Sequence, residues 1–115
     1  MNREVLEYYA DYFNKQKGQR FPCSNQVVVC AVVTHRLDRA LKIMSDRGVE
    51  PVMQSRSCVE WRIGNERWIW KPCNESCRGY RFYRVIVEDG IDDFVFDHII
   101  IIPCCDLYCC QFEIA

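Results

Sequence analysis

The chain has 115 residues, of which 15 are basic and 16 acidic, and its formal net charge is −1. Half of the residues are hydrophobic, which argues against a disordered chain, and the length fits one domain. No apolar run approaches the roughly 20 residues of a membrane-spanning helix, and the first residues lack the apolar core of a secretion signal. We therefore expect a single domain without membrane contact, located in the cytoplasm.

The N-terminal half of the sequence predicts a helix, a buried strand and a second helix. Asn2 can cap a first helix that runs to about Lys17. The sequence VVVCAVV (27–33) is a continuous, largely β-branched run, which is typical of a strand buried on both faces of a parallel sheet. Thr34 stands where a helix cap belongs, and Gly48 ends the second helix. The expected inner face of that helix consists of Leu37, Ala40, Leu41 and Met44.

The C-terminal half predicts more strands. Two apolar segments flank Gly64-Asn65, a dipeptide suited to a two-residue hairpin turn. The pairing places all three tryptophans on one face, as core or as a contact surface. RFYRVIVEDG (81–90) predicts a second buried strand, and the last residues a closing strand. The expected fold is α/β: a single small domain with a mixed β-sheet, a β-hairpin and two main helices.

Nine cysteines leave at least one thiol that is free or paired between chains. Cys73 and Cys77 have a spacing that zinc ligands use, which makes zinc a possible cofactor. Four further thiols lie in the tail, and strand alternation would split them between two faces. Burial as small hydrophobic side chains, zinc binding and disulfide formation all stay open. The tail thiols are Cys104, Cys105, Cys109 and Cys110.

The small net charge hides a polarity along the chain. Residues 36–84 carry eleven basic and six acidic side chains, whereas residues 85–115 carry seven acidic ones and no Lys or Arg. The two segments can neutralise each other within the fold, or they can present differently charged surfaces to partners.

The order of elements resembles the ATPase core of phage terminase large subunits, over roughly residues 26–103. The most specific part is RGYRFYRVIVED (78–89), which is similar to a Walker B strand. The resemblance implies that Glu88 matches the Mg²⁺-binding acid and Asp89 the catalytic acid, although the family order is Asp-Glu. No G-x-x-x-x-G-K-[ST] motif occurs, so the phosphate-binding loop is missing. The resemblance therefore implies a trimmed or repurposed core without ATPase chemistry.

Our first functional hypothesis is a non-catalytic protein-binding module of phage or mobile-element origin, acting in the host cytoplasm. It would modulate or inhibit a nucleic-acid-processing or defence enzyme. Its acidic end could mimic nucleic-acid phosphates in a basic cleft of the partner. The residues of this expected partner surface are Glu88, Asp89, Asp92, Asp93 and Asp97.

Two alternatives belong to other classes. A nucleic-acid-binding accessory protein of DNA packaging would use the basic middle segment. A divalent-metal nuclease would hold Mg²⁺ or Mn²⁺ with the C-terminal acids and Glu60. The two histidines, His35 and His98, are interpreted as partnered structural side chains. The basic residues of the nucleic-acid hypothesis are Arg56, Arg62, Arg67, Lys71, Arg78, Arg81 and Arg84.

Overall fold

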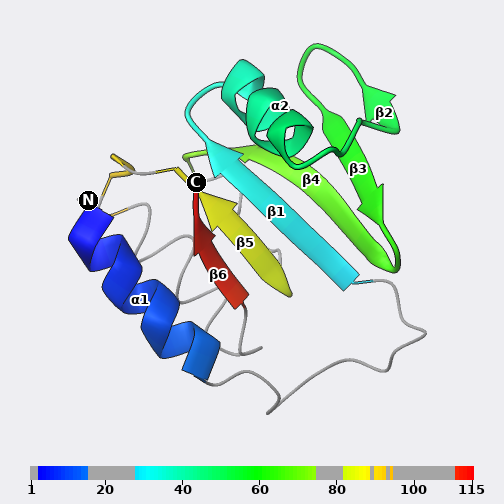
Figure 1. The fold of residues 1–115 in the computed structure, drawn as a ribbon. Helices are drawn as coiled ribbons and strands as arrows, with labels where there is room; N and C mark the ends of the chain where they lie inside the picture. Colours follow the sequence, from blue (N-terminus) through cyan, green and yellow to red (C-terminus); the bar gives the residue numbers. More distant parts are fainter. Residues whose placement is uncertain (1–2, 16–27, 75–81, 89, 93, 95–110) are drawn as a thin grey trace.

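A computed structural model of the protein describes residues 3–15, 28–74, 82–88, 90–92, 94 and 111–115. These residues form one mixed sheet of six strands and two helices (Figure 1), which confirms the expected small α/β domain. None of the described helices is long and apolar enough to cross a membrane. The elements are α1 (Arg3–Lys15), β1 (Val28–Thr34), α2 (Leu37–Asp46), β2 (Met53–Gln54), β3 (Val59–Ile63), β4 (Glu66–Pro72), β5 (Arg84–Val87) and β6 (Gln111–Ile114).

Strand β1 lies at the centre of the parallel part of the sheet. The strand order is β2-β3-β4-β1-β5-β6, and β1 pairs in parallel with both β4 and β5. Six of its seven residues are buried, as the continuous apolar run predicts. Strand β6 adds in parallel to β5 and confirms the expected closing strand. Three neighbouring strands, β4, β1 and β5, therefore end at the same edge of the sheet.

Helix α2 packs on one face of the sheet, over β1 and β4. Ala40 and Met44 of α2 are fully buried, whereas Leu37 and Leu41 of the same helix are partly buried against the core. The predicted inner face of this helix is thus the face that packs. Gly48 follows the helix with φ +77°, the left-handed conformation that commonly ends helices. The sheet side of this core consists of Val28, Cys30, Val32, Val59, Trp61, Trp68 and Ile86.

The predicted hairpin is present. Strands β3 and β4 are antiparallel, and the register pairs Trp61 with Trp68 and Ile63 with Glu66 across the two-residue turn. Gly64 has φ +60°, where a side chain would be strained. Trp61 and Trp68 are buried and Trp70 is half-buried against α2, so these tryptophans are core residues.

The start of α2 and the short strand β2 differ from the sequence prediction. Helix α2 begins at Leu37 and not just after Thr34, because Thr34 still belongs to β1 and pairs with Pro72. Its hydroxyl donates to the Arg36 carbonyl at 2.6 Å and does not cap the helix. Strand β2, only two residues long, was not predicted. The observed α1 fits the first predicted helix, but its expected cap lies outside the described residues.

The two edges of the sheet differ. Helix α1 packs against β6 and covers that edge. At the other edge, β2 pairs only with Val59 and Glu60 of β3. Exposed apolar side chains gather here, with Val52 60% and Met53 46% exposed. Native folds usually cover or shorten a sheet edge, and the two-residue β2 is such a shortened edge strand, with exposed apolar side chains beside it.

Candidate functional site

Three side chains that follow directly on three parallel strands come together at one edge of the sheet. His35 follows β1, Cys73 follows β4 and Glu88 follows β5. The register aligns Thr34 with Pro72, which puts His35 level with Cys73. It aligns Val33 with Val87, which puts Glu88 level with Thr34, one residue before His35. A nitrogen, a sulfur and an oxygen of the three side chains lie within 4.8 Å of one another. We call this group the strand-end cluster. Ligands of open α/β sheets bind outside the carboxyl ends of the strands, which is where it lies.

Glu88 is the centre of the strand-end cluster. Its side chain is 9% exposed, and one carboxylate oxygen accepts hydrogen bonds from the His35 backbone N–H at 2.5 Å and from its Nδ1 at 2.7 Å. The other oxygen accepts from Nε of Arg39 on α2 at 3.2 Å. Burial by itself would raise the pKa of Glu88, but these hydrogen bonds and the positive charge outweigh it and hold the pKa below its usual range. Glu88 is thus ionised at neutral pH.

Cys73 contributes a half-buried thiol to the strand-end cluster. Burial and the nearby negative charge of Glu88 together raise its pKa to about 12. The thiol is therefore protonated at neutral pH, and only the thiolate is a good nucleophile. The environment of Cys73 accordingly disfavours a nucleophilic cysteine, whereas a bound cation would deprotonate the thiol.

Hydrogen bonds at the end of β1 hold the turn that carries His35 of the strand-end cluster. Nε1 of Trp70 donates to the hydroxyl of Thr34 at 3.0 Å, and this hydroxyl donates to the Arg36 carbonyl. Thr34 is fully buried. The turn that carries His35 is thereby fixed to β4, so the imidazole and the carboxylate share a defined geometry.

The structure describes only part of the expected acidic partner surface. Glu88 is buried within the strand-end cluster, whereas Asp92 is exposed and accepts a hydrogen bond from the Phe94 N–H at 2.9 Å. Asp89, Asp93 and Asp97 lie outside the described residues. The described part of the surface thus places these two acids in different environments.

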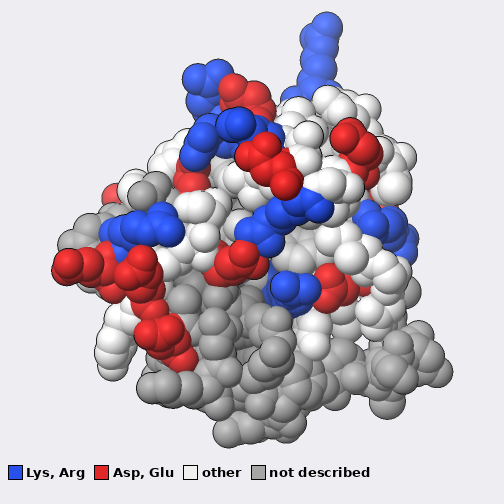
Figure 2. Space-filling view, in the orientation of Figure 1, with Lys and Arg blue, Asp and Glu red and all other residues white. Residues whose placement is uncertain are grey.

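Most of the described arginines of the nucleic-acid hypothesis are engaged by glutamates of the sheet. Arg67 and Arg62 both contact Glu60, at 2.7 and 3.3 Å. Arg84 contacts Glu66 at 3.2 Å and lies over the Trp68 ring. Figure 2 shows basic and acidic side chains interspersed on the face of the molecule that it draws. Arg56 is exposed and Lys71 half-exposed, whereas Arg78 and Arg81 lie outside the described residues.

The nuclease hypothesis needs carboxylates that converge. Glu60 lies on β3 with two arginines, and Glu88 lies at the strand ends with His35 and Arg39. Among the residues that the structure describes, the strand-end cluster is the one group of three metal-ligating side chains. This part of the chain thus holds no carboxylate cluster for Mg²⁺.

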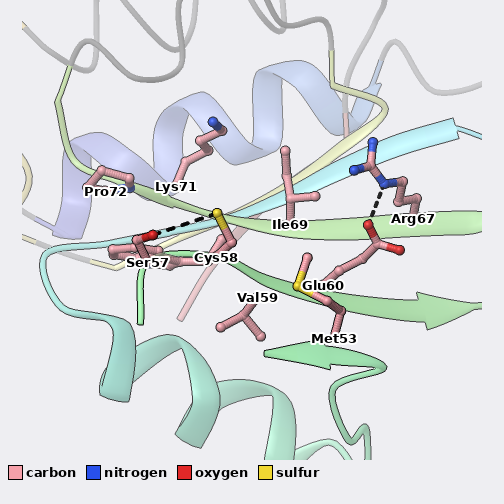
Figure 3. A pocket seen from close by; sticks show the side chains of 10 residues that line it. Met53, Ser57, Cys58, Val59, Glu60, Arg67, Ile69, Lys71 and Pro72 are labelled. Carbon is pink, nitrogen blue, oxygen red and sulfur yellow. Dashed lines mark hydrogen bonds and ion pairs between the residues drawn. The ribbon is translucent and has the colours of Figure 1, made fainter. Parts of the chain in front are cut away.

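A hollow lies on the face of the hairpin that points away from α2. It encloses about 430 Å³, and we call it the hairpin groove. In Figure 3 the side chains of Arg67, Ile69 and Lys71 rise from β4 on the same side, with Met53 and Cys58 next to them. The groove adjoins the open β2 edge of the sheet.

Sequence reasoning singled out Cys73 and Glu88 for different reasons and did not connect them with His35. The expected zinc partner, Cys77, lies outside the described residues. A usable signal was present: each of the three residues comes directly after an apolar strand. The sequence indicates that β4 pairs with β3 in a hairpin, but it does not indicate that β4 also pairs in parallel with β1, so this signal alone does not bring the three residues together.

Comparisons with protein-family models, with curated proteins and with solved structures find no match. The resemblance to terminase cores stays a prediction that rests on the residues quoted for it.

Proposed function

We propose that the chain is a non-catalytic protein-binding module. It modulates or inhibits its partner, a nucleic-acid-processing or defence enzyme. The observation that carries the proposal is the hairpin groove beside an open sheet edge with exposed apolar side chains. Such an edge can accept an extended segment of another protein as a further strand, and the neighbouring pockets select its side chains.

The connection from β1 to α2 supports a role without nucleotide hydrolysis. Only His35 and Arg36 separate the strand from the helix. A phosphate-binding loop needs several backbone N–H groups arranged around the phosphates, together with a lysine and a hydroxyl. Two residues cannot supply that loop. Glu88, which the terminase resemblance would assign to Mg²⁺, lies beside His35 and Arg39 and not beside a phosphate-binding loop.

The hairpin groove suits an extended peptide for two reasons. Val52 and Met53 leave apolar surface exposed along the short strand β2, which favours burial by a partner. The backbone of β3 is paired with β2 only at Val59 and Glu60, so the edge beyond that pairing can take a longer strand. The partner that fits is a protein with an extended, largely apolar segment.

The test uses the tagged full chain to capture its partner from an extract of the organism that encodes it or of its host. The affinity of the purified partner is then measured for wild type and for Met53→Glu. Because Met53 is 46% exposed, the substitution does not disturb the core. We expect the affinity to fall at least about tenfold, since a charge would enter an apolar interface.

Tyr8→Glu is the matched control, because Tyr8 is an exposed aromatic residue on α1 at the other end of the sheet. This variant is expected to bind the partner like wild type. Equal binding by Met53→Glu would refute the groove as the contact surface. Absence of any stoichiometric partner, together with hydrolysis of Mg·ATP by the purified chain, would refute the proposed function.

A further inference from the structure

We propose that the strand-end cluster is a binding site for a thiophilic divalent transition metal, Zn²⁺ being the best match, with His35, Cys73 and Glu88 as its protein ligands. The inference is independent of the proposed partner binding at the hairpin groove, because the two sites share no residue.

The donor set determines the class of metal. Imidazole nitrogen, thiolate sulfur and carboxylate oxygen are the three ligand types of protein zinc sites. Mg²⁺ and Ca²⁺ prefer oxygen ligands alone, so a thiol and an imidazole in the first shell select against them. Three protein ligands leave one tetrahedral position for water or another small ligand.

The spacing of the donor atoms is close to what zinc needs. With bonds of about 2.0–2.3 Å at tetrahedral angles, ligand atoms lie roughly 3.3–3.7 Å apart. The donor atoms of the strand-end cluster lie within 4.8 Å of one another. His35 Nδ1 and the Glu88 oxygen share a hydrogen bond at 2.7 Å, which opens when both residues coordinate the ion. Shifts of about 1 Å therefore complete the site, and rotation of side chains that follow strand ends can supply them.

The surroundings already provide the outer contacts of a metal site. Arg39 holds one oxygen of Glu88 at 3.2 Å, and the His35 N–H holds the other at 2.5 Å, so the carboxylate is fixed in place. Such contacts orient the first-shell ligands of known sites. The side chain of His35 is 51% exposed, which gives the ion a path from solvent.

The charges and protons of the three ligands can be followed when the metal ion binds. Glu88 coordinates as a carboxylate and His35 through an imidazole nitrogen that carries no proton, whereas Cys73 enters as a thiol and releases its proton to the buffer when sulfur coordinates the ion. The site then holds a 2+ ion against two negative ligands.

The experiment titrates Co²⁺, a spectroscopic substitute for Zn²⁺, into the reduced, chelator-treated full chain without oxygen, and then displaces it with Zn²⁺. We expect visible bands of tetrahedral Co²⁺ and a thiolate-to-cobalt charge-transfer band. Cys73→Ser should lose one equivalent of bound metal and the matching part of this band. His35→Ala should weaken binding at least about tenfold.

Cys58→Ser is the matched control, because the Cys58 thiol is exposed and lies in the hairpin groove. It should bind metal like wild type, which separates the proposed site from adventitious thiol binding. If Cys73→Ser does not fold, as judged by circular dichroism, His35→Ala decides the question, since its side chain is half exposed. Unchanged Co²⁺ affinity and spectra in both His35→Ala and Cys73→Ser, or no bound metal in wild type, would overturn the proposal.

Discussion

Two described glutamates, Glu60 and Glu88, have pKa values held below the usual range, and each lies between two nitrogen-bearing side chains. Glu60 accepts from Arg67 at 2.7 Å and from Arg62 at 3.3 Å. The Arg67 hydrogen bond is the largest influence on Glu60 and outweighs the opposing effect of burial. Charge-assisted bonds of this kind fix side chains in place.

Glu60→Gln should lower the free energy of unfolding by about 1 kcal/mol at pH 7, because it removes the charge that Arg67 and Arg62 share on a partly solvated surface. The folded-state pKa lies below the reference value of 4.5, so this stabilisation is complete above about pH 4.5 and disappears as the pH falls through the folded-state pKa. Urea unfolding of both proteins at pH 7 and pH 3 measures the difference. The exposed Glu50→Gln is the control, and a gap that widens in acid would contradict the prediction.

Thr34→Val should destabilise the fold by about 1–3 kcal/mol, since it leaves the Arg36 carbonyl and the Trp70 indole N–H without the hydroxyl that joins them. The volume of the buried side chain hardly changes, so the effect reports the hydrogen bonds. Thr34→Ser keeps the hydroxyl and should lose less. Thermal unfolding of the three proteins compares them, and equal losses in both variants would mean that the methyl group, not the hydroxyl, stabilises this turn.

The sequence predicts individual candidate site residues better than it predicts which of them lie together in the fold. Cys73 was selected for its spacing to Cys77, and Glu88 for its place after a buried strand. His35 was interpreted as structural, because an isolated histidine at a helix start has no local signal of a ligand. The three meet only through the parallel pairing of β4, β1 and β5, and pairing between distant strands is not encoded in local pattern.

At the level of elements, the hairpin was the most predictable part of the chain. Its turn dipeptide and the alternation of large apolar side chains specify one register, which the structure confirms for Trp61 and Trp68. The start of α2 was less predictable, because Thr34 suits a helix cap as well as a strand end, and pairing with Pro72 extends the strand. A two-residue strand such as β2 has no periodicity to detect.

Gly64→Ala should cost about 1 kcal/mol of stability, because Gly64 has φ +60°, which penalises a side chain. A Cβ atom there would meet no heavy atom within 4 Å, so the loss comes from backbone strain and not from a clash. Gly64→Asn should lose less, since asparagine tolerates the left-handed region. Urea midpoints measure the order of stability, and an alanine variant as stable as wild type would contradict this account of the turn.

At the scale of the whole molecule, the charge polarity along the sequence does not persist as two separated surfaces in the described part. Arg47 at the end of α2 bonds to Glu113 of β6, which joins the basic and acidic segments. Arg62, Arg67 and Arg84 are engaged by glutamates of the hairpin, within the basic segment itself. The Arg47–Glu113 contact favours neutralisation between the two segments, the first interpretation that the sequence left open, whereas the hairpin contacts neutralise arginines within the basic segment.

Arg62→Glu should therefore leave the affinity of the full chain for duplex DNA unchanged within about twofold at low salt. Arg62 already contacts Glu60, so it is not a dedicated phosphate ligand. Fluorescence anisotropy at several salt concentrations measures the affinity and its salt slope. A tenfold loss of affinity with a salt slope reduced by about one would instead identify Arg62 as a phosphate contact.

The strand-end cluster at the carboxyl edge of β4, β1 and β5 is the proposed metal site. The most direct measurement is anomalous scattering at the zinc absorption edge from crystals of the full chain grown with one equivalent of Zn²⁺. We predict a peak in bonding contact with the side chains of His35, Cys73 and Glu88, at about 2.0–2.3 Å from the donor atoms. A zinc peak held only by other cysteines, with this cluster unchanged, would contradict the proposal.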